Sequence, residues 1–410
     1  MAKVNWTNKS GGNFAIGTNW STGNVPGPSD IANINAPYTV TSSANETVLA
    51  ITTSPTATLD LTAGNFTALA GTGTGANAGG ISVESGAFLT VGGTVKNSGI
   101  ITLNGTGFLS FSRATILQGG GKLTLSNNLG NQNLNINGGF QTLTNVDNVI
   151  SGSGYIDGSL VNESKGVIDA NGSSNYLSVN WNSPYLLTNA GILEATSTGG
   201  LLLGGSITNT ASGVIGALGA GSNVTIQGGG TLSGGTLETT SGGQILITAE
   251  TIDGSNGHTV TNTGSVSVNN VILLGTINNT GTIAVSNNNQ IVVGTGGATL
   301  AGSGSVTVFD NTANGITGND TSATLTNQNT ISGAGEIGGN GLLLTNQGVI
   351  DATGVNPLII DTGASAVTNS GTLEATNNST LFVEQRHKHR TLQRPLELNC
   401  IRSYLRPPTR

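Results

Sequence analysis

The decapeptide LTNAGILEAT, residues Leu187–Thr196, returns 180 residues later as VTNSGTLEAT, residues Val367–Thr376, with seven of ten residues unchanged. It belongs to a longer duplication. Four segments recur in the same order. They begin at residues 142 (TLTN), 150 (ISGSGYI), 166 (GVIDA) and 188 (TNAGILEAT), and their close copies begin at 324, 331, 348 and 368. A duplication of this length predicts a periodic scaffold in which a whole group of repeats was copied.

Eight turns in the chain share one pattern centred on an Asn. An aliphatic residue stands two positions before each Asn, a Gly follows two or four positions after it, and Ile, Leu or Val stands two positions past that Gly. Because apolar and polar residues alternate after the turn, the pattern predicts short strands with one face inward. We expect the Asn side chains to form a ladder, with amides bonded between coils, at Asn97, Asn162, Asn189, Asn209, Asn262, Asn279, Asn346 and Asn369.

The backbone of these turns carries a separate prediction. Gly adopts angles that other residues resist, and Asn tolerates the left-handed region. We therefore expect the turn residues to use that region, with a positive φ at glycines such as Gly371.

The spacing of the turns sets the fold class. Neighbouring copies lie 27, 20, 17 and 23 residues apart. A coil of roughly 20 residues stacked at about 4.8 Å on the next lets every backbone group pair with the coils on either side. The sequence therefore predicts an all-β protein, a single-stranded right-handed parallel β-helix (solenoid) of roughly 15 to 18 coils. Its predicted parts are an N-terminal cap at residues 1–40, repeats at 41–385 and a basic tail at 386–410.

Composition agrees with a solenoid. The chain has 410 residues, of which 65 are Gly, and 35% are hydrophobic but only 8% charged and 4% aromatic. The hydrophobic fraction is too high for a disordered chain. The scarcity of Phe and Trp excludes a large globular core, so burial has to come from thin layers of Val, Ile, Leu and Ala.

The charge of the sequence and its lack of long apolar runs argue against two classes of partner, nucleic acids and membranes. Residues 1–385 contain 19 acidic side chains and six basic ones, a net charge of 6 − 19 = −13. Such a surface repels phosphate backbones, so we expect no nucleic-acid binding. No apolar run is long enough to cross a bilayer, and the start MAKVNWTNKSGG lacks the apolar core of a secretory signal. We therefore expect another export route or a missing N-terminus.

The end of the chain differs from the repeats. After Gln385 come RHKHR, the only Cys (Cys400) and seven of the 13 Lys and Arg residues. We interpret residues 386–410 as a disordered, non-native tail read in a shifted frame, and a basic anchoring tail is the alternative. In the first interpretation His387 and His389 form no metal site, and a single Cys allows neither an internal disulfide nor a CxxC zinc site.

The repeats over roughly residues 40–385 resemble the β-strand-repeat regions of large bacterial secreted and surface proteins, the filamentous-haemagglutinin-like and autotransporter-passenger class. The opening segment, with Trp6, GGNF and Trp20, resembles the start of such regions. The resemblance implies a parallel β-helix whose first coil is capped by Trp6, Phe14 and Trp20. It also implies a secreted or cell-surface location in a bacterium, a chain that is part of a longer one, and a host or matrix glycan or protein as partner.

The candidate chemical residues are two carboxylate pairs. Asp169 and Glu194 are expected on successive coils, and Asp351 and Glu374 form the duplicate pair. Such pairs could raise one pKa, as in a glycoside hydrolase, or hold Ca²⁺. Because no His, Tyr or Arg accompanies them, solvated outward side chains are the simpler interpretation. We therefore predict no catalytic residue, no metal and no cofactor, with calcium as the exception to test.

The functional prediction follows from these residues. We expect a non-catalytic extracellular or cell-surface structural protein, adhesin-like, that presents a long β-helical surface. The alternative is a polysaccharide-active β-helix enzyme, a lyase or a glycoside hydrolase, since such enzymes use the same architecture.

Overall fold

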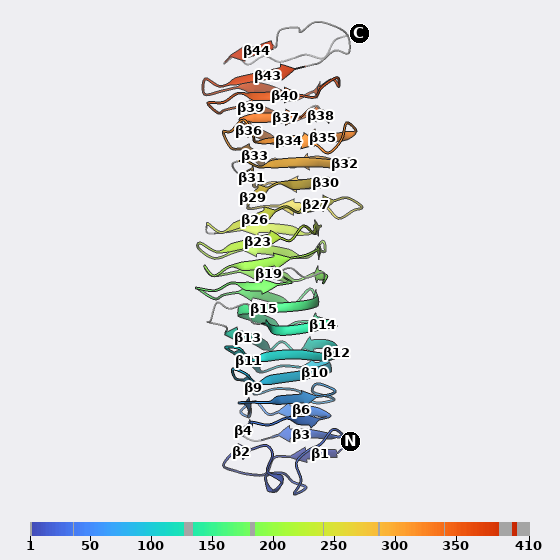
Figure 1. The fold of residues 1–410 in the computed structure, drawn as a ribbon, viewed down its shortest axis with the longest axis vertical. Coiled ribbons are helices and arrows are strands. Elements are labelled where there is room, and N and C mark those ends of the chain that lie inside the picture. Colours follow the sequence, from blue (N-terminus) through green and yellow to red (C-terminus); the bar gives the residue numbers. More distant parts are fainter. Residues whose placement is uncertain are drawn as a thin grey trace. The chain divides into compact units, whose positions relative to one another are not determined.

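The computed structural model describes residues 2–35, 37–126, 134–180, 185–240, 242–285, 288–339 and 341–384, and the backbone of 396–399. The chain divides into two compact units, Met1–Ser206 and Ile207–Arg410. In each unit, short strands pair with strands about one coil further along the chain (Figure 1). The predicted all-β parallel solenoid is confirmed, and the one helical element of the described residues is a short 3-10 turn, η1 (Gly17–Asn19).

The first unit has three stacks of parallel strands, and the chain visits them in turn. The first stack contains β2 (Gly12–Asn13), β4 (Thr39–Ser42), β7 (Thr58–Leu61), β9 (Gly80–Val83), β11 (Ile100–Asn104), β13 (Lys122–Ser126), the start of β15 (Val149–Asn162), β16 (Val167–Ala170) and β19 (Ile192–Ala195). The second contains β5 (Glu46–Val48), β8 (Asn65–Ala68), the starts of β10 (Phe88–Lys96), β12 (Phe108–Gln118) and β14 (Leu134–Asn145), the middle of β15, β17 (Leu177–Val179) and β20 (Leu201–Gly204). The third begins with a separate three-stranded sheet of β1 (Ala2–Asn5), β3 (Asp30–Ile34) and β6 (Ala50–Thr53), and continues with the ends of β10, β12, β14 and β15 and with β18 (Leu187–Asn189). Isolated bridges from Asn77 to Thr53 and to Asn97 join the two parts.

The second unit repeats this plan. Its first stack contains β23 (Asn223–Gln227), β26 (Gln244–Thr248), β29 (Ser265–Asn269), β31 (Thr282–Val285), β33 (Ser305–Val308), β36 (Thr330–Gly333), β39 (Val349–Ala352) and β42 (Thr372–Ala375). The second contains β21 (Ile207–Asn209), β24 (Thr231–Ser233), β27 (Thr251–Gly254), the starts of β30 (Val271–Asn279) and β32 (Gln290–Ala301), β34 (Gly315–Gly318), β37 (Gly335–Gly338), β40 (Leu358–Asp361) and β43 (Thr380–Glu384). The third contains β22 (Val214–Ala217), β25 (Thr236–Thr239), β28 (Val260–Asn262), the ends of β30 and β32, β35 (Ala323–Asn327), β38 (Leu342–Asn346) and β41 (Thr368–Asn369).

The alternation in sequence decides which side chains enter the core. In β7, Leu59 and Leu61 are buried while Asp60 between them faces outward, and β9 repeats this with Ile81 and Val83. Each buried aliphatic side chain contributes about 1.5–3 kcal/mol. The core of each unit is thus a series of thin aliphatic layers, one per coil, and the outward residues are free to vary.

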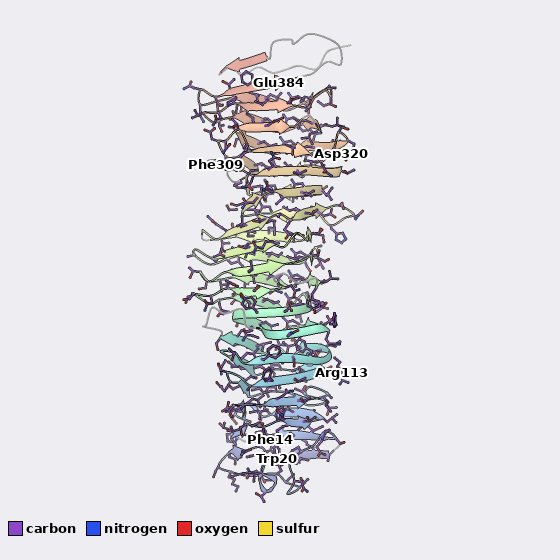
Figure 2. The ribbon with its side chains drawn as sticks, viewed as in Figure 1. Phe14, Trp20, Arg113, Phe309, Asp320 and Glu384 are labelled. Carbon is purple, nitrogen blue, oxygen red and sulfur yellow. The ribbon has the colours of Figure 1, made fainter. Side chains whose placement is uncertain are left out.

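Aromatic side chains close the beginning of the first unit, where Figure 2 labels Phe14 and Trp20. Trp6, Phe14 and Trp20 are all buried. Trp20 lies edge-on to both Trp6 and Phe14, with ring centroids 5.0 and 4.9 Å away, and its indole N–H donates to the Phe14 carbonyl at 2.8 Å. Phe14 also contacts Phe66 of β8, 5.1 Å away, so these rings cover the first aliphatic layer.

The structure describes little of the predicted tail. Strand β44 (Leu396–Asn399) pairs with β43 in antiparallel register, unlike the parallel strands of the stacks. The other residues of segment 386–410, including His387, His389 and Cys400, lie outside the described residues. The interpretation of the tail as disordered and non-native therefore stays a prediction.

Candidate functional site

The first carboxylate pair lies on adjacent strands of the first unit. Asp169 of β16 and Glu194 of β19 occupy the same register position, and both side chains are half-buried. Thr196 Oγ1 donates to Asp169 Oδ1 at 2.7 Å, and Asn171 Nδ2 donates to Asp169 Oδ2 at 3.1 Å. Burial raises the pKa of Glu194, and the neighbouring charge of Asp169 raises that pKa further. The pair therefore consists of the hydrogen-bonded carboxylate of Asp169 and the carboxyl group of Glu194, whose pKa is raised.

The second pair repeats this geometry in the second unit. Asp351 of β39 lies in register with Glu374 of β42, and Thr376 Oγ1 donates to Asp351 Oδ2 at 2.9 Å. Thr196 and Thr376 are the last residues of the two related decapeptides. The duplication has therefore copied the hydrogen bond together with the carboxylates.

The surroundings of the pairs limit their chemistry. The described residues contain no group of three or more His, Cys, Asp or Glu side chains arranged to hold a metal ion. Ca²⁺ takes six to eight oxygen ligands, whereas one pair offers four carboxylate oxygens, one of them already bonded to a Thr hydroxyl. The sequence has no Lys or Arg from residue 166 to 384, so no cation of this segment can neutralise an acidic substrate beside Asp351. Calcium binding stays the untested exception to the predicted absence of a metal, and water would have to supply the remaining ligands.

A chain of Asn side chains runs through the interior of the first unit. Each amide nitrogen donates to the side-chain oxygen of an Asn in the following coil, and all of these side chains are buried. At one turn the chain of hydrogen bonds passes from one Asn to another: Asn148 accepts from the preceding coil, and Asn145 of the same turn donates to the next coil. The hydrogen bonds are Asn77 to Asn97 (2.7 Å), Asn97 to Asn148 (2.9 Å), Asn145 to Asn162 (2.9 Å) and Asn162 to Asn189 (2.9 Å).

The second unit contains the same arrangement, with the same shift between two Asn residues of one turn. Among the eight predicted positions, Asn369 is half-buried and the other seven are buried. Five residues of the two ladders were not predicted from the sequence, although the TLTN motif contains two of them. These residues are Asn77, Asn145, Asn148, Asn327 and Asn329. The hydrogen bonds are Asn262 to Asn279 (2.7 Å), Asn279 to Asn329 (2.7 Å), Asn327 to Asn346 (2.9 Å) and Asn346 to Asn369 (2.8 Å).

The predicted backbone of the turns is wrong. None of the eight turn Asn residues has a positive φ, and neither does Gly371 or any other Gly of the pattern. These glycines are needed for close stacking instead. A Cβ on Gly371 would lie 2.0 Å from the carbonyl oxygen of Gly348 in the preceding coil, and a Cβ on Gly191 would lie 2.2 Å from that of Gly166. The turns of successive coils approach too closely for any side chain at this position.

An open groove of about 470 Å³ crosses four consecutive coils of the first unit. Residues 55–58, 78–80, 98–100 and 120–122 line it, at the edge of the stack formed by β7, β9, β11 and β13. Lys122 is its one charged lining residue, and the exposed side chain of Ile100 stands beside it in register. The nearby carboxylate of Asp147 accepts N–H groups of Gly119 and Gly120 at 2.6 and 3.0 Å.

Gly80 leaves one lining position of the groove without a side chain. Its register partners in neighbouring coils, Thr58 and Ile100, carry side chains, as does Lys122 one coil further. A Cβ on Gly80 would be 3.4 Å from Thr58 Oγ1, which is ordinary contact, so packing does not require a Gly here. Sequence reasoning missed this groove, and its signal was a Gly at a strand position where other coils carry larger residues.

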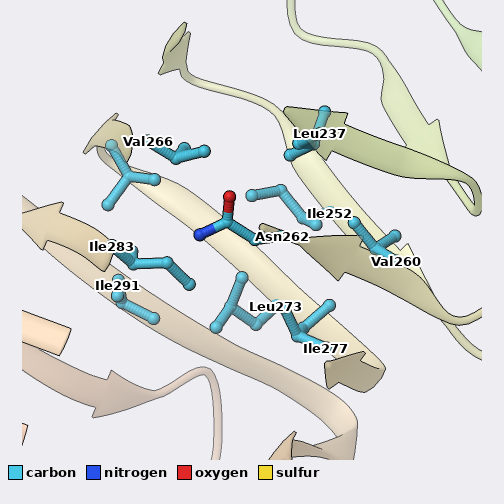
Figure 3. Close-up of a pocket in the computed structure, with 10 residues that line it drawn as sticks. Leu237, Ile252, Val260, Asn262, Val266, Leu273, Ile277, Ile283 and Ile291 are labelled. Carbon is cyan, nitrogen blue, oxygen red and sulfur yellow. The ribbon is translucent and has the colours of Figure 1, made fainter. Parts of the chain in front are cut away.

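The interior of the second unit holds one small void beside Asn262 (Figure 3). Its volume is about 10 Å³, and apolar side chains such as Leu237, Val266 and Ile291 surround it. This volume is at the lower limit for a single water molecule. The void is a packing defect where the Asn ladder begins, and it has no room for a ligand.

Comparisons with protein-family models, with curated proteins and with solved structures found no match. The class of the protein is therefore defined by its fold alone, and it is a β-solenoid repeat protein. Within the described part of the chain, no helix has the length and apolar character needed to cross a membrane.

Proposed function

We propose that this protein is a non-catalytic, adhesin-like element of a bacterial cell surface or extracellular matrix, of the β-strand-repeat class named above. The groove of the first unit supports this proposal most directly. It is continuous over four coils, and eight of its 13 lining residues are Gly, Ala or Ser. A surface of this kind suits an extended polymer better than a small molecule, which needs an enclosed pocket with convergent polar groups.

The proposed partner is a glycan chain that carries carboxylate groups. Lys122 is exposed at one end of the groove and offers an ammonium group to such a carboxylate, while Ile100 offers an apolar surface to a sugar ring. No carboxylate lines the groove, although the first 385 residues contain 19 acidic side chains. The carboxylate of Asp147 lies beside the groove, where it accepts the N–H of Gly120 at 3.0 Å, so Lys122 is the one lining residue that can attract an anionic chain.

Replacing Gly80 by valine is expected to abolish glycan binding without unfolding the protein. Valine suits a strand position and has room for its Cβ, but its methyl groups would fill the groove. The measurement is binding to immobilised carboxylated and neutral glycans. Ser265→Val, at the exposed first position of β29, is the matched control and should leave binding unchanged.

Lys122→Gln separates the contribution of the lysine charge to glycan binding from that of the shape of the groove. We expect it to weaken binding of carboxylated glycans and to reduce the salt dependence of that binding, since it removes the one cation of the groove. Full binding by Gly80→Val would contradict the assignment of the groove.

One observation favours the enzymatic alternative. Burial and the charge of Asp169 raise the pKa of Glu194, which lies on the strand next to Asp169. A glycoside hydrolase similarly places a proton donor of raised pKa near a second carboxylate. Release of shortened glycan products by the wild type, lost in Asp169→Asn and Asp351→Asn, would support a polysaccharide-active enzyme. Adhesion without product release would support the first proposal.

A further inference from the structure

Glu250 occupies a position that other coils of the second unit give to aliphatic residues. Ile272 of β30 pairs with Thr251 of β27, and the Ile272 N–H donates to the Glu250 carbonyl at 2.9 Å. The register therefore places Glu250 opposite Val271. Glu250 is buried, with 1% of its surface exposed. The aliphatic residues that continue this buried column are Val271, Ile291, Ile316, Ile337 and Ile360.

The carboxyl group of Glu250 is only partly hydrogen-bonded. Oε1 accepts the N–H of Gly229 in the preceding coil at 3.0 Å. Oε2 is buried and has no hydrogen-bond partner among the described residues. An ionised carboxylate needs donors at both oxygens when it is removed from water, whereas a protonated carboxyl group loses less. The site therefore favours the protonated form.

Among the residues that the structure describes, no neighbouring charge offsets this preference. The strands that pair with β26 and β27, namely β23, β24, β29 and β30, contain no titratable side chain, and the adjacent β25 contributes only the half-exposed Glu238. The nearest titratable groups along the chain are Asp253, whose Oδ1 accepts the Ser255 N–H at 2.8 Å, and the exposed His258. Burial raises the pKa of Glu250, and this is counteracted only in part by the N–H of Gly229, which donates to Oε1, and by the nearby N–H of Gly230.

We propose that Glu250 is a buried proton-binding site that makes the second unit more stable in mildly acid than in neutral solution. The folded state binds this proton more tightly than the unfolded state, so the stabilisation is complete below the ordinary pKa of Glu. It is lost as the pH rises from that value, 4.5, to the raised folded value. The inference is independent of the proposed adhesive function.

Glu250→Gln tests the proposal, because the amide keeps an acceptor for the Gly229 N–H and cannot ionise. The measurement is hydrogen exchange of the β26 and β27 amides in the full chain between pH 4 and 8, corrected for the intrinsic exchange rate. In the wild type, the opening equilibrium should rise about tenfold for each unit by which folding raises the pKa. In Glu250→Gln this rise should disappear, and the coil should be better protected than wild type at pH 8.

Glu238→Gln is the matched control, since it removes a half-exposed carboxylate from β25 in the same unit and should leave the rise unchanged. The carboxyl groups of Asp310 and Asp320 are hydrogen-bonded, their pKa values are lowered, and they titrate below this pH window. Infrared titration of the wild-type carboxyl groups, with Glu250→Gln as the difference sample, gives a second readout. An unchanged rise in Glu250→Gln, or a Glu250 group that titrates at the ordinary value, would overturn the proposal.

Discussion

Valine in place of Gly371 is expected to destabilise the last described coils of the second unit by about 3 kcal/mol or more, at the upper end of the cost of overpacking. The new Cβ would lie 2.0 Å from the Gly348 carbonyl oxygen, which belongs to the backbone of the preceding coil and cannot rotate away. The two turns would have to separate, and the Gly371 N–H would lose its bond to the Asn346 carbonyl at 3.2 Å.

The damage from Gly371→Val should be local, because each coil contacts only its neighbours. Hydrogen exchange should show loss of protection in β38, β39, β41 and β42, while β23 and β26 keep theirs. Gly80→Val is the control, since the same substitution meets only ordinary contact there. Equal stability of Gly371→Val and wild type would refute the close-stacking explanation of the turn glycines.

Leucine in place of Asn346 is the second substitution with a large expected effect. The Asn346 amide donates to Asn369 Oδ1 at 2.8 Å and to the Thr372 carbonyl at 3.1 Å, and its oxygen accepts the Asn327 amide at 2.9 Å. Leucine has a similar shape but leaves these buried partners unsatisfied, at a cost of about 1–3 kcal/mol for each group that finds no water. The shift of the urea midpoint measures the loss.

Asn369→Leu provides a graded comparison. Asn369 is half-buried, so water can replace part of what the substitution removes. We expect its destabilisation to be clearly smaller than that of Asn346→Leu. A larger effect for Asn369→Leu would show that burial does not decide the contribution of a ladder residue.

The sequence was sufficient to predict the strands that flank the eight Asn turns and the aliphatic character of the core. In GVIDA, the apolar residues Ile168 and Ala170 alternate with Asp169, which predicts a strand with Asp169 facing outward, as β16 has it. The duplication predicted that Asp351 would repeat this position in β39. Such predictions succeed because burial depends on a period of two residues, which is local information.

The failures concern distances between coils, which no local pattern contains. Turn glycines were expected to need a positive φ, but the carbonyl of the preceding coil excludes a side chain there. The shift of the ladder from Asn97 to Asn148, and its new start at Asn145, depends on which two turns lie in contact. In the same way, nothing in the segment TAET indicates that Glu250 continues a column of Val and Ile.

The parallel stacking of coils also determines how the protein responds to mechanical force. Within each unit, the hydrogen bonds between coils lie along the direction in which the strands stack. A pull on the chain ends in that direction opens the bonds of one coil before it loads the next. Each released coil of roughly 20 residues adds about 70 Å of extended chain. A protein of this architecture would lengthen in steps under load, while the coils that remain closed keep their fold.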